Sequence, residues 1–139
     1  MKARIFHPRS TKPVVVLIGS RIWEDSKTIE NHLTQIQPVL VIDGNTRGAE
    51  AIASDWCAKT GTLNLRMPAQ PAHYHDKALH TRNLLILQVA TMLAHSLNTG
   101  IIVLAYPWGD SPGTRNMMRQ ATEYGLETRV TESTWEPKT

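Results

Sequence analysis

The sequence is poor in features that would assign it to a specialised class of protein. Cys57 is its single cysteine, which excludes a framework of intramolecular disulfides. No apolar run approaches the length that a membrane-spanning helix needs, and the opening stretch MKARIFHPRSTKP lacks the apolar core of a signal peptide. These absences argue against a disulfide-rich or membrane-spanning protein, and we expect a cytoplasmic one.

The excess of charge of one sign is also small. Fifteen Lys and Arg residues stand against twelve Asp and Glu residues, which leaves a formal charge of +3 at neutral pH. This mild excess suits a phosphorylated small molecule and falls short of a surface that coats nucleic acid. A chain of 139 residues, of which 41% are hydrophobic, is large enough to bury one core. We therefore expect one domain over residues 13–131, between tails at residues 1–12 and 132–139.

Hydrophobic patterning predicts alternating strands and helices. Three continuous runs of β-branched residues and leucine are typical of parallel strands that are covered on both faces. Amphipathic helical spacing follows the first two of these runs. The predicted fold is α/β: a single Rossmann-like doubly wound domain of about five mostly parallel strands, in the order 3-2-1-4-5, with helices on both faces. The predicted strands are 14–19, 39–43, 62–67, 101–105 and 127–130, and the longest predicted helix is 82–97.

Three of these strands lead into a helix through short stretches rich in glycine and other turn-forming residues. In a sheet of order 3-2-1-4-5, the carboxyl ends of strands 1, 2 and 4 meet near the point where the strand order reverses, which is where such folds bind ligands. Glycines let backbone N–H groups approach an anion closely, and a helix starting at Thr114 would add unpaired N–H donors. We interpret PWGDSPGT as a phosphate cradle. The three stretches are GSRIWEDS (19–26), DGNTRGAE (43–50) and PWGDSPGT (107–114).

Four short motifs, in this order and spacing, resemble those of the SLOG superfamily of Rossmann-like nucleotide-binding proteins: GSR (19–21), GNTRGA (44–49), HTRN (80–83) and WGDSPGT (108–114). This superfamily joins the Smf/DprA DNA-processing proteins with the LOG cytokinin-activating phosphoribohydrolases, and the branch most similar to this chain is that of the small YspA-like proteins of unknown function. The resemblance spans residues 13–131. It implies that the chain binds a nucleotide or nucleotide-derived molecule and forms a homodimer or higher homo-oligomer.

The resemblance also implies which residues contact the ligand. The first motif matches the branch closely and includes the following Trp23, whereas the second has Asn45 where the branch has a paired glycine and Glu50 where it has an aspartate. The third loop carries two extra residues and one glycine fewer than the family's Pro-Gly-Gly-x-Gly-Thr, so its cradle is either wider or partly blocked by Trp108. The candidate ligand-binding residues are Gly19, Ser20, Arg21, Gly44, Asn45, Arg47, Gly48, Arg82, Asn83, Trp108, Gly109, Gly113 and Thr114.

The glutamate that LOG hydrolases place just after their Gly-Thr pair is missing here, since RNM follows Thr114. The catalytic arginine of those enzymes is matched by Arg82 in HTRN. Cleavage of an N-glycosidic bond develops positive charge on the ribose, which a nearby carboxylate stabilises and Asn116 cannot. We take Arg82 and Glu50 as the candidate catalytic residues. The acids that could substitute from other loops are Glu50, Asp43 and Asp110.

Simpler roles compete with ligand binding at most of these positions. The glycines could serve tight strand-to-helix turns alone, and the arginines could be solvated surface charges. We favour ligand binding because the glycine loops converge on one side of the sheet. Trp23 and Trp108 could stack on a nucleobase or cover the core. Trp56, at helical spacing with Ile52 and Ala53, is assigned to the core.

Several residue types that bind metals lie close together in the long connection 67–80, namely His73, His75, Asp76 and His80. Their spacing matches no metal motif, and His80 is accounted for by HTRN, so we expect neither a metal nor a cofactor. Cys57 has no matched histidine in the sequence, and we expect it to be inert.

Two functions from different classes remain, with a third behind them. The first is binding or sensing of a nucleotide or nucleotide-derived phosphorylated ligand in a cleft at the carboxyl ends of the strands, because the cradle is present while the hydrolase glutamate is not. The alternative is a LOG-type phosphoribohydrolase that cleaves a nucleoside monophosphate at its N-glycosidic bond. Single-stranded nucleic-acid binding is the third; the basic composition favours it, whereas the small net charge and few aromatic residues oppose it.

Overall fold

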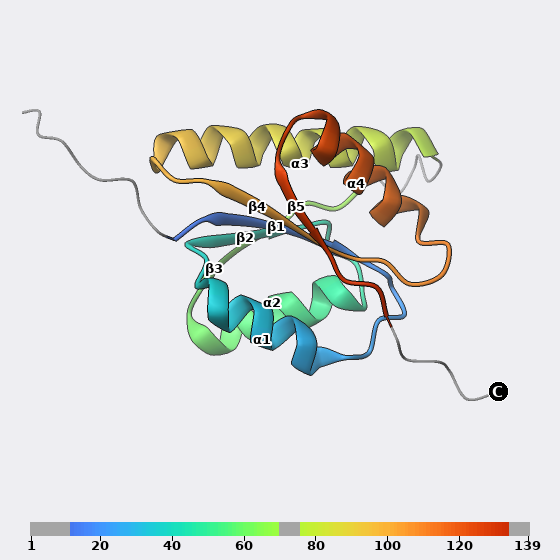
Figure 1. Ribbon diagram of the computed structural model, residues 1–139, viewed down its shortest axis with the longest axis horizontal. Coiled ribbons are helices and arrows are strands. Elements are labelled where there is room, and N and C mark those ends of the chain that lie inside the picture. Colours follow the sequence, from blue (N-terminus) through green and yellow to red (C-terminus); the bar gives the residue numbers. More distant parts are fainter. Residues whose placement is uncertain (1–11, 70–75, 134–139) are drawn as a thin grey trace, which may run out of the picture.

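A sheet of five parallel strands forms the centre of the structure, a computed structural model that describes residues 12–69 and 76–133 (Figure 1). The strand order is β3-β2-β1-β4-β5, and every neighbouring pair runs parallel. This arrangement confirms the predicted α/β doubly wound fold and its strand order. The strands are β1 Val14–Gly19, β2 Leu40–Asp43, β3 Leu63–Arg66, β4 Ile101–Tyr106 and β5 Glu127–Val130.

Helices cover both faces of the sheet (Figure 1). α1 (Ser26–Ile36) and α2 (Ala49–Thr60) pack on one face, and α3 (Asp76–Ser96) and α4 (Pro112–Glu123) pack on the other. Each of the strands β1 to β4 is therefore followed by a helix that returns the chain to the opposite end of the sheet, and all strand-to-helix loops lie at the carboxyl ends of the strands.

The sequence of β1 explains its central place. Its six residues, VVVLIG, carry no polar side chain, and β-branched residues suit a pleated surface that is packed on both sides. Val14, Val16 and Ile18 belong to the core beneath α3 and α4. Leu17 belongs to the core beneath α1 and α2, which Trp56 also joins with only 7% of its surface exposed, as its spacing predicted.

Local signals set the ends of the helices. The carboxylate of Asp25 accepts hydrogen bonds from the hydroxyl and the N–H of Thr28; these bonds cap α1 and lower the pKa of Asp25. α3 begins at Asp76, earlier than predicted; the prediction missed its first residues because they are largely polar and the apolar pattern starts later. α4 begins at Pro112 rather than Thr114, since the first turn of a helix tolerates proline, which lacks an N–H.

The edge strands of the sheet are more exposed than its inner strands. β3 and β5 have four residues each, and Leu63 of β3 is 68% exposed. No helix in the described part of the chain is both long and apolar enough to cross a bilayer. The predicted tails fall largely on residues outside the described ranges, and His73 and His75 lie outside them too.

Candidate functional site

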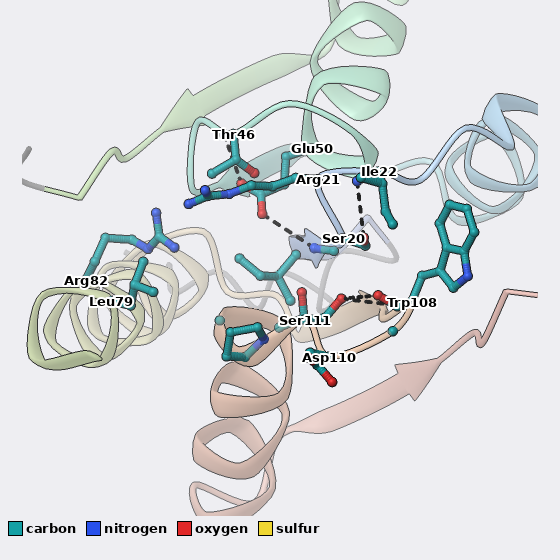
Figure 2. Close-up of a pocket in the computed structure, with 16 residues that line it drawn as sticks. Ser20, Arg21, Ile22, Thr46, Glu50, Leu79, Arg82, Trp108, Asp110 and Ser111 are labelled. Carbon is teal, nitrogen blue, oxygen red and sulfur yellow. Dashed lines mark hydrogen bonds between the residues drawn. The ribbon is translucent and has the colours of Figure 1, made fainter. Parts of the chain in front are cut away.

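A cleft opens at the carboxyl ends of β1 and β4, where the strand order reverses (Figure 2). Its volume is about 390 Å³. Its walls come from the loops after β1, β2 and β4, from the first turn of α4 and from α3. The lining residues are Ile18, Gly19, Ser20, Arg21, Ile22, Thr46, Glu50, Leu79, Arg82, Trp108, Gly109, Asp110, Ser111, Pro112, Gly113 and Thr114.

The cleft brings together most of the candidate residues. Those that line it are Gly19, Ser20, Arg21, Glu50, Arg82, Trp108, Gly109, Gly113 and Thr114. Those that do not line it are Gly44, Asn45, Arg47, Gly48 and Asn83. Asp110, considered above as a substitute acid, also lines the cleft. The remaining lining residues were not candidates, although all except Ile18 and Leu79 lie within the three glycine-containing stretches, and Leu79 directly precedes HTRN.

The first loop folds back on Ser20. The Ser20 hydroxyl accepts a hydrogen bond from the N–H of Ile22 at 3.2 Å, and its carbonyl accepts one from the N–H of Trp23 at 3.3 Å. Arg21 lies exposed at the cleft (Figure 2). Trp23 is only 4% exposed and packs edge-on against Tyr106, with ring centroids 5.3 Å apart. Trp23 is therefore part of the core and not a platform for a nucleobase.

Gly48 marks a close approach between the first and second loops. Its φ is 78°, and a Cβ placed on it would lie 2.2 Å from the carbonyl oxygen of Ser20 and 2.6 Å from that of Arg21. Gly44 is confined in a similar way, since its Cβ would lie 2.5 Å from Nη1 of Arg82. Packing between protein groups thus accounts for glycine at both positions, and ligand contact at either of them stays a prediction.

Glu50 is buried in the first turn of α2, with 1% of its surface exposed. Its Oε1 accepts hydrogen bonds from the N–H groups of Gly44, at 2.7 Å, and Thr46, at 3.3 Å. Its Oε2 accepts a longer bond from the N–H of Gly19, at 3.4 Å. Burial, followed by repulsion from Asp43, raises the pKa of Glu50 above its usual value. The carboxylate therefore ties the first two loops together.

Arg82 reaches the cleft from α3 and is also buried, with 7% of its surface exposed. Its Nη1 donates to the carbonyl oxygen of Gly44 at 2.8 Å, and its Nε donates to Oδ1 of Asn83 at 3.0 Å. Burial lowers the pKa of Arg82, yet a guanidinium stays protonated in proteins. Among the residues that the structure describes, Nη2 of Arg82 has no hydrogen-bond partner.

Asp43 lies outside the cleft. Its carboxylate forms an ion pair with Nε of Arg66 at 2.9 Å and accepts hydrogen bonds from Nδ2 of Asn64, at 3.0 Å, and the N–H of Asn45, at 2.7 Å. These bonds join the ends of β2 and β3 and fix the start of the second loop. Of the two other acids considered for catalysis, Asp110 lies exposed on the cleft wall and Glu50 lies buried beside it.

Ser111, which lies within WGDSPGT but was not among the candidate residues, holds the third loop. It adopts a left-handed backbone, with φ 36° and ψ 58°. Its hydroxyl accepts a hydrogen bond from the N–H of Trp108 at 3.1 Å and donates one to the carbonyl of Trp108 at 2.7 Å. α4 starts directly after Ser111, so its first turn, with Gly113 and Thr114, lines the cleft. N–H groups of a first turn have no partner within their helix, and the positive end of the helix dipole faces the cleft.

Asn83 holds the start of α4 against α3. Its Nδ2 donates to the carbonyl oxygen of Gly113 and to Oδ1 of Asn116, both at 3.0 Å. Oδ1 of Asn116 also accepts from Nε2 of Gln120 at 2.7 Å, and Nδ2 of Asn116 lies 3.2 Å from Nδ1 of His80. In sequence, Asn116 stands shortly after Thr114, near the position of the glutamate in the LOG hydrolases. Its amide is engaged in a hydrogen-bond network between α3 and α4.

The residue types that bind metals do not gather within residues 12–69 and 76–133: no three His, Cys, Asp or Glu side chains there form a metal-binding group. His73 and His75 lie outside these ranges, and His80 contacts Asn116. Cys57 is buried, and burial raises the pKa of its thiol to about 11. A thiol of that pKa is a poor nucleophile at neutral pH, in line with an inert cysteine.

Comparison with known proteins relates the chain to one family. The family model described as YspA, cpYpsA-related SLOG family matches residues 13–74. The Gene 61 protein of Mycobacterium phage D29 is 28% identical over 117 residues, which cover 81% of this chain and 90% of the phage protein. Among solved structures, the C-terminal domain of a hydrogenase from Pyrococcus furiosus matches at 13% identity and a TM-score of 0.43, over 89% of this chain and 95% of that one. Residues 13–74 include the first two glycine loops, and their match confirms the predicted resemblance to the SLOG superfamily.

Proposed function

We propose that this protein binds or senses a nucleotide or nucleotide-derived phosphorylated ligand in the cleft at the carboxyl ends of β1 and β4. One observation carries the proposal: the first turn of α4, with Gly113 and Thr114, lines the same cleft as the side chains of Arg21 and Arg82. Unpaired N–H groups at a helix start and arginine side chains are typical donors to phosphate groups in proteins.

The cleft also has room and apolar surface for a base. Its volume of about 390 Å³ falls within the roughly 300–1,000 Å³ of small-molecule sites. Figure 2 shows Trp108 and Ile22 at one end of the cleft and Arg82 and Leu79 at the other. Ile22 is 55% exposed and Trp108 is half-buried, so this end presents the kind of surface on which a nucleobase packs. The proposed ligand lies with its phosphate near α4 and its base toward Trp108.

Binding without cleavage is favoured by the state of Glu50 and by Asn116, which stands near the position of the glutamate of the LOG hydrolases. Cleavage of a glycosidic bond needs a carboxylate that is free to face the developing charge on the ribose. Asn116 offers an amide that is already hydrogen-bonded to Asn83 and Gln120. Glu50 accepts three backbone hydrogen bonds and is almost fully buried.

Two measurements test the binding proposal. Mass spectrometry of small molecules released by denaturing the protein, as purified from cells, should find a phosphorylated nucleotide derivative. Calorimetric titration should show AMP binding that Arg82→Ala weakens by about tenfold or more, because a charge-assisted hydrogen bond contributes about 1.5–3 kcal/mol. Arg119→Ala is the matched control, since it removes an exposed arginine of α4 that does not line the cleft. If no compound is retained and AMP does not bind, the proposal is contradicted. Equal affinity of the two variants for AMP would remove Arg82 from the site.

A LOG-type phosphoribohydrolase is the second candidate, because Arg82 and Glu50, the two candidate catalytic residues, both line the cleft. This activity requires that incubation with nucleoside monophosphates release free base and ribose 5-phosphate. Release must also be lost in Arg82→Ala while the Arg119→Ala protein keeps it. If chromatography detects no free base from the common nucleoside monophosphates, the hydrolase candidate is excluded and binding is the remaining proposed function.

We also propose a homodimer or higher homo-oligomer, supported by exposed apolar side chains on α3 and β3. Leu85 and Met92 of α3 are 49% and 67% exposed, and Leu63 of β3 is 68% exposed. Leu63 lies on the sheet face that α3 covers, because it pairs in register with Leu40, which packs beneath α3. Light scattering should give at least twice the 15.6 kDa of one chain, and Met92→Lys should lower that mass. A monomeric wild-type mass would contradict the proposal.

A further inference from the structure

Three backbone N–H groups from the first two loops point at one carboxylate beside the cleft. The N–H groups of Gly44, Thr46 and Gly19 donate to Glu50 at 2.7, 3.3 and 3.4 Å. Arg82 lies against the same place, because Nη1 of Arg82 and Oε1 of Glu50 would be 2.5 and 2.9 Å from a Cβ on Gly44. Converging N–H groups next to an arginine are the features with which proteins bind phosphate and other anions. We call this group of donors the amide pocket.

The amide pocket is already filled by the protein's own negative group. Glu50 is 1% exposed and sits in the first turn of α2, where the helix dipole favours a negative charge. A ligand anion could enter only by displacing a side chain that three N–H groups hold. Thr46 and Arg82 line the cleft together with Glu50, so the occupied pocket adjoins the space that is open to a ligand (Figure 2).

Other N–H groups of these two loops are also engaged. That of Ser20 donates to the carbonyl of Tyr106, that of Ile22 to the hydroxyl of Ser20, and that of Asn45 to Oδ1 of Asp43. Donors open to the cleft include the first turn of α4 and the exposed Arg21 side chain, and Nη2 of Arg82 has no hydrogen-bond partner among the described residues. These donors suffice for one phosphoryl group.

We infer that Glu50 acts as an internal anion that occupies the second of two adjoining anion sites, and so restricts the cleft to ligands with a single phosphoryl group. The inference rests on the proposed function and makes Glu50 a specificity-determining residue in place of a catalytic one. A second phosphoryl group would meet the negative charge of Glu50 on one wall and that of the exposed Asp110 on another. Like charges at such short range in a partly desolvated cleft repel strongly.

We call the restriction to a single phosphoryl group the charge limit. Calorimetric titration of AMP and ADP into the wild type and into Glu50→Gln tests it. Glutamine keeps the size of the side chain and an oxygen for the N–H groups of Gly44 and Thr46, but removes the charge. The wild type should bind AMP about tenfold or more tightly than ADP, and Glu50→Gln should reduce this preference by about tenfold. Arg119→Gln, outside the cleft, should leave the preference unchanged. An equal preference in the wild type and Glu50→Gln would overturn the charge limit.

Chemical rescue of Glu50→Ala tests, without any nucleotide, whether Glu50 acts as the internal anion of the amide pocket. Removing the carboxylate leaves three N–H groups without their acceptor and takes a nearby negative charge from Arg82, so sodium formate should raise the melting temperature of this variant by about 3 °C or more above the effect of sodium chloride. Glu50→Gln, whose side chain still fills the pocket, should show no such rise. If Glu50→Ala is unfolded in chloride, formate should restore its circular dichroism. If formate has no effect beyond that of chloride, the inference that Glu50 acts as an internal anion is overturned.

The two arms separate this inference from the function on which it rests. A wild type that binds neither AMP nor ADP overturns the proposed function and the charge limit with it. Formate rescue in that case would still support Glu50 as the anion of the amide pocket.

Discussion

Alanine in place of Gly48 would disrupt the contact that positions the first loop on the second. Gly48 has φ 78° and ψ −130°, a conformation that residues with a Cβ rarely adopt. Holding such a residue there costs about 1–3 kcal/mol. The new Cβ would also lie 2.2 Å from the carbonyl oxygen of Ser20, a backbone atom that cannot rotate away. We expect Gly48→Ala to lower the free energy of unfolding by about 3–4 kcal/mol, a large share of the ~5–15 kcal/mol of a typical domain.

Gly61→Ala separates the backbone strain from the close approach. Gly61 also has a positive φ, of 75°, at the end of α2, but a Cβ there would meet nothing within 4 Å. Its replacement should cost only the backbone strain, about 1–2 kcal/mol. Urea unfolding followed by circular dichroism measures both losses, and equal slopes against urea show that the variants unfold from comparable states. Equal losses for Gly48→Ala and Gly61→Ala would refute the reasoning that the two loops touch at Gly48.

Three further predictions concern the walls of the cleft. Gly113→Val should abolish binding of AMP while moving the melting temperature by less than about 2 °C, because a Cβ on Gly113 meets nothing within 4 Å beyond its chain neighbours and the backbone of its own helix, and the residue lines the cleft; a folded variant with normal affinity in calorimetry would contradict the phosphate cradle. Ser111→Ala should lower the free energy of unfolding in urea by about 1–2 kcal/mol, because both hydroxyl bonds to Trp108 are lost; a loss no larger than that of an exposed serine would contradict this. Because burial raises the pKa of Glu50, the folded protein holds that proton more tightly than the unfolded chain, so the wild type should lose stability relative to Glu50→Gln as pH rises above about 4.5; thermal melts that keep a constant difference over this range would argue against it.

The strands could be predicted because each central one is a continuous apolar run. A strand that is covered on both faces has no polar alternation, and VVVLIG shows this in its six residues. The start of α3 could not be placed in this way, because the helix begins in a largely polar stretch at Asp76 before its apolar pattern appears. Pro112 begins α4 although the sequence pattern pointed to Thr114, since proline is tolerated in a first turn and says little about where that turn starts.

The glycine loops showed which parts of the chain meet, but not which groups in them face the cleft. Gly44 and Gly48 fit the family motif, yet the space that their missing side chains leave is taken by Arg82 and by the carbonyl of Ser20. A glycine that admits a ligand and a glycine that admits another part of the backbone look identical in sequence. Only the packed loops distinguish the two.

The amino-acid sequence by itself determined the order of strands and helices, the family and the end of the sheet at which the loops converge, because these follow from local apolar patterns and short motifs. Only the tertiary structure decided which charged groups at that end of the sheet are buried, paired or exposed. Glu50 lies two residues after Gly48 but accepts hydrogen bonds from N–H groups of two separate loops, and Asp43 pairs with Arg66 on the neighbouring strand β3. Burial and hydrogen-bond partners are properties of segments brought together from distant parts of the chain, so no local pattern specifies which carboxylate is free and which is engaged.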